Sequence, residues 1–213
     1  DRQEDEDNKQ AAWRLDPAQA GVSSCMGDIG VHAANLAEYV CGQQISEICS
    51  DLTAFVPGRQ LDDDGAVLLR FANGARGVLH ASQISVGEEN AIKVRVYGEK
   101  GGLEWEQQDP NTLLLKWADQ PMQMLRTGGA YLGDAASANT RTPMGHPEGY
   151  LEAFANLYIA FAGQICAYQG GDEPDPRSAD CPGIEDAIRG MTFIELAVSA
   201  SASDVKWHKF EQY

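Results

Sequence analysis

An aspartate and a histidine stand four residues apart in the segment Gly27-Asp28-Ile29-Gly30-Val31-His32. On an α-helix, residues four apart lie one turn apart on the same side, so the two side chains could hydrogen-bond or converge on one ligand. Histidine titrates near neutral pH, and a neighbouring carboxylate can orient its ring. Asp28 and His32 are therefore candidates for general acid-base chemistry, although a helix cap and a structural histidine would account for the same spacing.

The helix that would carry them is predicted to begin at Gly27-Asp28 and to end at Gly42. Asn35 and Tyr39 continue the polar stripe of Asp28 and His32, about 110° from the centre of the apolar face. A polar stripe beside a buried face lies at the rim of the packed surface, where a cleft could form. The apolar residues at helical spacing are Ile29, Ala33, Leu36, Ala37 and Val40.

The pattern then changes to strands. Residues 66–72 and 75–80 flank Asn73-Gly74, the strongest short signal for a two-residue type I′ hairpin turn, which needs positive φ at both positions. Two apolar faces result, which indicates a sheet covered on both sides. One face would carry Leu68, Leu79 and Ala81, and the opposite face Val67, Leu69, Phe71 and Val78.

A second hairpin consists of residues 92–97 and 102–106, joined by residues 98–101. A four-residue loop places opposite charges on one face and apolar groups on the other, as cross-strand pairing prefers. The expected pairs are Arg95 with Glu104, Lys93 with Glu106, Val96 with Leu103, and Val94 with Trp105. A turn at Asp109-Pro110-Asn111 leads into residues 112–117, so these strands form an antiparallel meander.

Residues 118–145 lack a period and are predicted to form a long ordered loop. A helix then begins at Pro147 and ends at Gly170-Gly171, with the apolar stripe Tyr150, Phe154, Leu157, Tyr158, Phe161 and Ile165. A last helix from about Gly183 carries Ile184, Ile188, Met191, Ile194 and Val198, and residues 205–210 could add a terminal strand. We expect an α+β fold, a predominantly antiparallel open-faced β-sheet with helices packed on one face and the other face used for oligomerisation.

The composition limits the partners and the compartment. The 213 residues are 43% apolar, and Asp and Glu outnumber Lys and Arg 32 to 16, giving a formal charge of −16 that argues against nucleic acid and anionic membranes. Five cysteines without a C-x-x-C pair indicate reduced thiols in a cytoplasmic protein. The acidic residues 1–7 do not resemble a signal peptide, and residues 1–12 are expected to be a linker remnant.

The segment around Asp28 and His32 resembles the signature of the glucose-fructose oxidoreductase and inositol dehydrogenase (Gfo/Idh/MocA) family. The resemblance extends over nearly the whole chain, through Trp13-Arg14-Leu15-Asp16-Pro17, Gly21 and the segments 97–105 and 145–150. It implies His32 as general acid/base and Asp28 as its partner or a substrate ligand, in the NAD(P)-dependent oxidation of a sugar or polyol hydroxyl. Many members have Asp where this chain has Asn35, which could alter the selectivity for ring hydroxyls.

Further substrate-binding candidates lie on both sides of this helix. Trp13 and Arg14 are expected near the cleft, with Asn35 on the polar stripe. His146 precedes a proline, which favours an extended backbone, so its ring could project from the end of the long loop. Arg141 and Glu148 flank it and could contact sugar hydroxyls. Packing on Tyr150 and an exposed salt-bridged surface explain these three residues nearly as well.

The sequence lacks a G-x-G-x-x-G turn between a strand and a helix, so the phosphates of a dinucleotide would have no helix N-terminus to bind. We therefore expect residues 1–213 to be a C-terminal substrate-binding and oligomerisation domain, with the N-terminal Rossmann domain absent from this chain. NAD or NADP would be bound mainly by that missing domain, and the fragment alone would be inactive. A homodimer or homotetramer would form through the sheet.

Two other hypotheses remain open at this point. The chain could be a non-catalytic oligomerisation module that has lost substrate binding. It could also be part of a metal-dependent sugar isomerase or hydrolase, because Asp28, His32, His146 and Glu148 are of types that bind divalent cations. No tight ligand spacing supports a metal site.

Overall fold

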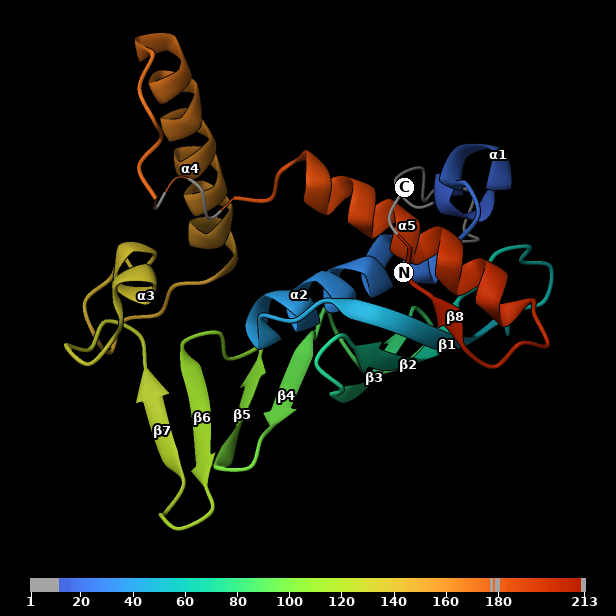
Figure 1. Ribbon diagram of the computed structural model, residues 1–213, viewed down its shortest axis with the longest axis horizontal. Coiled ribbons are helices and arrows are strands. Elements are labelled where there is room, and N and C mark those ends of the chain that lie inside the picture. The colour runs from blue at the N-terminus through green and yellow to red at the C-terminus, as the bar shows by residue number, and fades with distance from the viewer. Residues whose placement is uncertain (1–11, 177, 179–180, 212–213) are drawn as a thin grey trace. The chain divides into compact units, whose positions relative to one another are not determined.

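The computed structural model describes residues 12–176, 178 and 181–211, and Figure 1 shows its helices and strands. The chain divides into two compact units, the first formed by residues 1–88 and 184–213 and the second by residues 89–183. Every strand pairing among the described residues is antiparallel, and helices accompany the sheets, which confirms the α+β class. None of the described helices combines the length and apolar character needed to cross a membrane.

The first unit is built on a four-stranded sheet in the order β3-β2-β1-β8. Helices α2 and α5 and the turn η2 pack on one face of this sheet, and the core lies between them (Figure 1). The predicted terminal strand is present as the short β8. The elements are η1 (Ala12–Leu15), α1 (Pro17–Ala20), η2 (Met26–Gly30), α2 (Val31–Cys41), β1 (Ile45–Thr53), β2 (Asp64–Phe71), β3 (Arg76–Ser82), α5 (Ile184–Ser201) and β8 (His208–Lys209).

The hairpin between β2 and β3 turns in three residues, where two were predicted. Phe71 N donates to Ala75 O at 3.0 Å, so residues 72–74 form the loop. Gly74 has φ 92°, whereas no non-glycine residue of the described chain, Asn73 included, has positive φ. The prediction of a type I′ turn is therefore wrong, because the extra loop residue lets the chain reverse with a single left-handed position.

One extra loop residue shifts the register by one and reassigns the two faces. Val67 pairs with Leu79, and Leu68 pairs with Val78. Leu68 and Val78 are 42% and 73% exposed. The predicted division of the faces is wrong, since the buried face consists of Val67, Leu69, Phe71, Leu79 and Ala81.

The predicted apolar stripes of the two helices in the first unit are only partly buried. On α2, Ala34 is buried while Val40 is 37% exposed, and α2 ends at Gly42 in the left-handed conformation, as expected. On α5, the predicted Ile194 is buried together with Phe193 and Ala197, whereas Ile184, Ile188 and Met191 are exposed. The two helices approach closely at Gly190, where an added Cβ would lie 3.1 Å from Val31 Cγ2.

The second unit contains a four-stranded antiparallel sheet in the order β4-β5-β6-β7. The predicted pairs of Arg95 with Glu104 and Val94 with Trp105, and the two pairs beside them, all occur. The predicted long loop is partly wrong, because residues 118–145 also contain a fourth strand and a short helix. The elements are β4 (Lys93–Tyr97), β5 (Gly101–Glu106), β6 (Thr112–Trp117), β7 (Gln123–Arg126), α3 (Asp134–Ala138) and α4 (Tyr150–Gly170).

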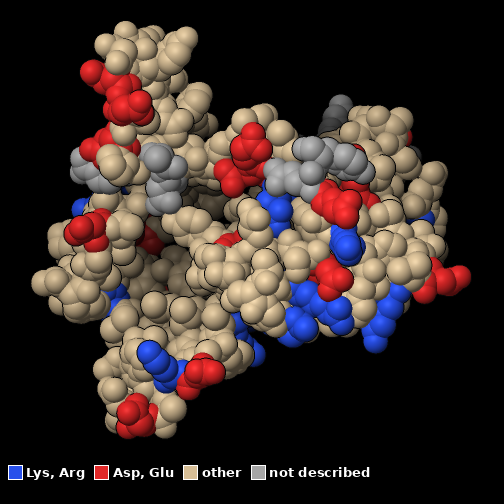
Figure 2. Space-filling model, in the orientation of Figure 1, with Lys and Arg blue, Asp and Glu red and all other residues tan. Residues whose placement is uncertain are grey.

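Helix α4 begins at Tyr150, three residues after the predicted start at Pro147, because Glu152 accepts a hydrogen bond from Gly149 N at 2.8 Å and caps the helix there. It ends before Gly171, which has φ 73°, as expected. Its predicted apolar stripe is largely exposed in the described unit, with Tyr158 at 72% and Phe161 at 56%. The surface of α4 is mostly uncharged (Figure 2). Such a surface is typical of an interface with another chain or domain.

Candidate functional site

Asp28 lies in a π-helical turn, η2, that runs directly into α2. Val31 N donates to Met26 O, the five-residue spacing of a π-turn, where a regular α-helix was predicted. Asp28 lies within this wider turn, and His32 follows in the first turn of α2. Single π-turns within helices occur frequently at functional sites.

Two glycines make room for the side chain that anchors this turn. Met26 is fully buried, and a Cβ added to Gly30 would lie 2.1 Å from its Sδ atom. A Cβ added to Gly65 on β2 would lie 2.8 Å from Met26 Cε. The Met26 side chain therefore holds the π-turn against the sheet. It leaves room for no side chain larger than that of glycine at positions 30 and 65.

The start of the turn is capped by an aspartate from a distant segment. The Asp62 carboxylate accepts from Ser24 N at 3.0 Å and Met26 N at 2.7 Å, and Cys25 N donates to Asp62 O at 3.0 Å. Ser23 Oγ accepts a further bond from Gly27 N at 2.9 Å. These contacts satisfy backbone N–H groups that a helix start leaves unpaired.

The Asp28 carboxylate is held by two donors from other parts of the chain. Arg14 donates from Nε to Oδ2 at 2.9 Å and from Nη2 to Oδ1 at 3.3 Å. Gln83, which follows β3, donates from Nε2 to Oδ2 at 3.1 Å. The Arg14 guanidinium also lies over the Trp13 ring, 4.7 Å from its centroid. The structure thus brings together Trp13, Arg14 and Asp28, which the sequence analysis selected separately.

His32 lies on α2 with an exposed side chain. Within the described residues, neither oxygen of Asp28 is hydrogen-bonded to the His32 ring, so of the two arrangements that the spacing allows, the direct bond is not formed. Asn35, one turn further along α2, is exposed and borders a small hollow with Glu38 and Arg189. His32 is accessible for chemistry, and Asp28 is oriented by groups other than His32.

The candidates of the second unit lie in the segment before α4. The Glu148 carboxylate accepts backbone hydrogen bonds from Arg141 N at 2.9 Å and Thr142 N at 2.7 Å. Arg141 donates from its guanidinium to Glu152 O at 2.9 Å. His146 is exposed, with Nδ1 placed 3.2 Å from Pro143 O. Glu148 and Arg141 therefore shape the segment 141–148, on which His146 is exposed.

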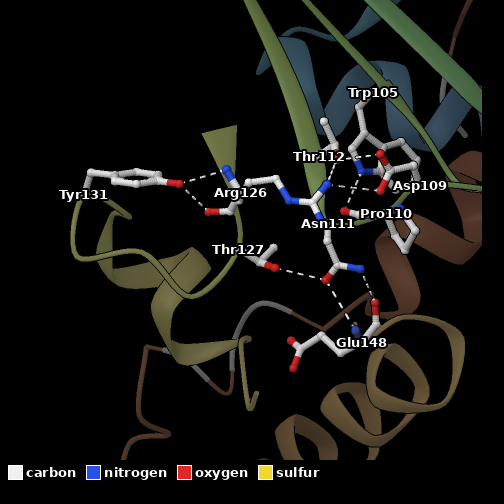
Figure 3. A network of polar contacts seen from close by, with 9 residues as sticks. All are labelled: Trp105, Asp109, Pro110, Asn111, Thr112, Arg126, Thr127, Tyr131 and Glu148. Carbon is white, nitrogen blue, oxygen red and sulfur yellow. Dashed lines mark hydrogen bonds and ion pairs between the residues drawn. The ribbon is translucent and has the colours of Figure 1, made fainter. Parts of the chain in front are cut away.

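Glu148 is also tied to the sheet through its backbone, as Figure 3 shows. Asn111, buried at the start of β6, donates from Nδ2 to Glu148 O at 2.8 Å and accepts from Thr127 Oγ1 at 2.9 Å. Burial by itself raises the pKa of Glu148, but the backbone bonds from Thr142 and Arg141 outweigh it and hold the pKa below its usual value. The Glu148 carboxylate is thus charged, and its hydrogen bonds go to backbone N–H groups.

The described residues contain no group of three or more His, Cys, Asp or Glu side chains that could hold a metal ion. The metal-site hypothesis therefore gains no support from this geometry. The antiparallel pairing throughout the described strands also leaves no parallel strand-helix-strand unit of the kind that binds dinucleotide phosphates.

Sequence reasoning missed the residues that position Asp28. Asp62 and Asp63 belong to an acidic run that appears solvated in the sequence, yet they are 9% and 0% exposed. Their place directly before an apolar strand is a weak signal of burial. Gln83 and Ser24 carry no local signal, because their contacts join segments more than fifty residues apart.

Comparison with known proteins gives consistent matches. The family model for the GFO/IDH/MocA C-terminal domain matches residues 1–104. The uncharacterized oxidoreductase YfiI of Bacillus subtilis (strain 168) is 34% identical over 201 residues, which cover 93% of this chain and 51% of YfiI. This chain therefore spans about half the length of that relative.

Two solved structures are similar over most of the chain. An oxidoreductase from Sinorhizobium meliloti has 46% identity and a TM-score of 0.82, covering 87% of this chain and 52% of that one. An inositol dehydrogenase homologue from Azotobacter vinelandii, complexed with NAD+, has 32% identity and a TM-score of 0.89, covering 95% and 53%. A homologue of the same description was also solved with NADH and myo-inositol.

Proposed function

Because the chain belongs to the GFO/IDH/MocA family, we propose that it is the substrate-binding domain of a nicotinamide-dependent oxidoreductase acting on a hydroxyl carbon of a sugar or polyol. The observation that carries the proposal is that a tethered carboxylate, Asp28, and an exposed histidine, His32, lie four residues apart on one continuous helical segment. A carboxylate and an imidazole are the groups that bind a hydroxyl and transfer its proton.

Oxidation of a hydroxyl carbon releases a hydride to the cofactor and a proton to the protein. In the proposed reaction His32 accepts the hydroxyl proton, and in the reverse direction it returns that proton. Asp28 accepts a hydrogen bond from a substrate hydroxyl and orients it. Arg14 binds Asp28 and Trp13 lies against Arg14, while Asn35 follows His32 on α2. These three residues are proposed as substrate contacts, with Arg14 acting partly through Asp28.

In the second unit we propose the segment 141–148 as a further source of substrate contacts. The His146 ring is exposed and its segment is held by Glu148 and Asn111, so the ring is presented from an ordered backbone. Arg141 and Glu148 contribute through the shape of the segment, because the Glu148 carboxylate and the Arg141 guanidinium bond to backbone groups.

The proposed cofactor is NAD or NADP, held mainly by an N-terminal domain outside this chain. The relatives solved with NAD+ and NADH favour NAD. We place the protein in the cytoplasm, which the five free cysteines support.

A second copy of the chain is proposed to cover the apolar face of the second sheet, where Val96, Leu103 and Leu115 are only half-buried. Light scattering of the purified protein would test the oligomer.

Replacement of His32 in the full-length protein tests the proposal. We expect the wild type to reduce NAD+ or NADP+ with a compound from a panel of myo-inositol, D-glucose and sorbitol. His32→Ala should lower kcat at least about 100-fold, as loss of a general acid-base does. The control His80→Ala, on the exposed side of β3, should retain activity.

The same variant separates the enzyme from a non-catalytic oligomerisation module. If the wild type turns over none of the panel with either cofactor, or if His32→Ala retains full activity, the proposed catalytic role is wrong. If His32→Ala forms the same oligomer as the wild type, its loss of activity comes from the missing imidazole and not from altered assembly.

A further inference from the structure

The two oxygens of the Asp28 carboxylate are used unequally by the protein. Oδ2 accepts from Arg14 Nε at 2.9 Å and from Gln83 Nε2 at 3.1 Å, whereas Oδ1 accepts only the longer 3.3 Å bond from Arg14 Nη2 among the described residues. An ionised carboxylate offers about four acceptor positions. Oδ1 can therefore accept a further hydrogen bond, whereas Oδ2 already accepts two from protein side chains.

The orientation of the Gln83 amide follows from its two partners. A carboxylate that is ionised can only accept, so the nitrogen of Gln83 must face Asp28. The other end of the amide, Oε1, accepts from Ser24 Oγ at 3.2 Å. Ser24 is 5% exposed, so the hydroxyl that orients Gln83 is itself shielded from water.

The backbones that carry Asp28 and Gln83 are anchored to two adjacent residues, Asp62 and Asp63. The Asp62 carboxylate binds Ser24 N and Met26 N at the start of the π-turn, and Asp63 O accepts from Gln83 N at 2.8 Å. Asp63 is fully buried, and its carboxylate accepts from Phe55 N and Val56 N at 2.8 and 2.9 Å. The dipeptide Asp62-Asp63 thus fixes the distance between the aspartate and the glutamine.

We propose that Gln83 is a positioning residue for the reaction, oriented by Ser24. It holds Oδ2 of Asp28 and thereby presents Oδ1 to a substrate hydroxyl. Arg14 alone fixes the carboxylate less firmly, because its side chain is partly exposed, at 27%, and its bond to Oδ1 is long, at 3.3 Å. This inference rests on the proposed function, in which Asp28 binds the substrate.

The test compares Gln83→Met with Gln60→Met in the full-length protein. Methionine keeps the length of the side chain but donates no hydrogen bond, and Gln60 is an exposed residue of the same unit. With the panel compound that the wild type oxidises, Gln83→Met should lower kcat about 10-fold while KM changes less than about threefold. Gln60→Met should leave both constants unchanged.

A crystal structure of the Gln83→Met variant gives a readout that does not depend on activity. We expect the Asp28 carboxylate to be rotated or to occupy two conformers, with Arg14 following it. An Asp28 that keeps its wild-type position would overturn the inference, whatever the kinetics. So would an unchanged kcat in Gln83→Met when His32→Ala is inactive, and in that case the proposed function would stand.

Ser24→Ala tests the series of hydrogen bonds that runs from Ser24 through Gln83 to Asp28. Because Ser24 acts only through Gln83, its loss should lower kcat in the same direction but less, by about threefold. In the double variant Gln83→Met with Ser24→Ala, kcat should be no lower than in Gln83→Met. If the two substitutions lowered kcat additively, Ser24 would not act through Gln83 as proposed. If Gln83→Met unfolds, the kinetics of Ser24→Ala and the position of Asp28 in its crystal structure decide the inference.

Discussion

Arg189 on α5 donates from Nε and Nη2 to the two carboxylate oxygens of Glu38 on α2, at 2.6 and 2.5 Å. Glu38 Oε1 also accepts from Ile45 N at 2.6 Å, and Arg189 Nη2 reaches Ile45 O at 2.9 Å. The two side chains are 14% and 16% exposed. A single, largely buried ion pair therefore joins α2, α5 and the start of β1, and it supports the helix that carries His32.

Glu38→Gln should destabilise the protein by about 3 kcal/mol, because it leaves a mostly buried guanidinium without its counter-charge. Urea denaturation would measure the change in the free energy of unfolding. The control is Glu106→Gln, whose partner Lys93 is 3.9 Å away and whose side chain is 49% exposed. That variant should lose no more than about 0.5 kcal/mol. Equal losses would show that the buried pair has no special role.

Gly30→Ala should destabilise the protein by about 1 to 3 kcal/mol, because the new methyl group would overlap the buried Met26 side chain. Thermal unfolding would measure the effect. Gly133→Ala is the matched control, since a Cβ there meets nothing within 4 Å and φ is −69°. A Gly30→Ala protein as stable as this control would mean that the π-turn tolerates a side chain at that position.

Cys25 should resist alkylation in the native protein. Burial, with added repulsion from Asp62 and Asp64, raises the pKa of its thiol to about 12, and the thiolate is the reactive form. Mass spectrometry after iodoacetamide treatment at pH 8 should find Cys25 unmodified, and fully modified once guanidinium is added. Rapid labelling of Cys25 in the folded protein would contradict the buried position of the π-turn start.

The charge on Glu148 should make the segment 141–148 sensitive to acid. Because the pKa of Glu148 is lowered in the folded protein, its stabilisation is present above the ordinary glutamate pKa of about 4.3 and is lost as pH falls through the lowered pKa. Glu148→Gln should cost about 1 kcal/mol at pH 7, and the difference from wild type should shrink in acid.

Amide hydrogen exchange at Arg141 and Thr142 would report this locally, since both donate to the Glu148 carboxylate. Exchange of these amides should be faster in Glu148→Gln. The exposed Glu99 offers a control, and Glu99→Gln should leave the two amides unchanged. A constant difference between Glu148→Gln and wild type at all pH values would show that charge is not the cause.

The sequence by itself determined the features that depend on near neighbours. The pairing of Arg95 with Glu104 follows from a hairpin of a few residues, in which opposite charges and apolar groups separate only in one register. The helix ends at Gly42 and Gly171 follow from the freedom of glycine to adopt positive φ. The residues Asp28 and His32 could be selected because their types and spacing are visible in a single segment.

Only the tertiary structure decided how Asp28 is held. Gln83 lies 55 residues away in sequence and Ser24 lies 59 residues from Gln83, so no local pattern relates them. The buried side of α5 was likewise set by tertiary packing, which buries Phe193 beside the predicted Ile194 and leaves Ile184 exposed. Contacts between distant segments depend on which surfaces meet, and that is a property of the folded chain as a whole.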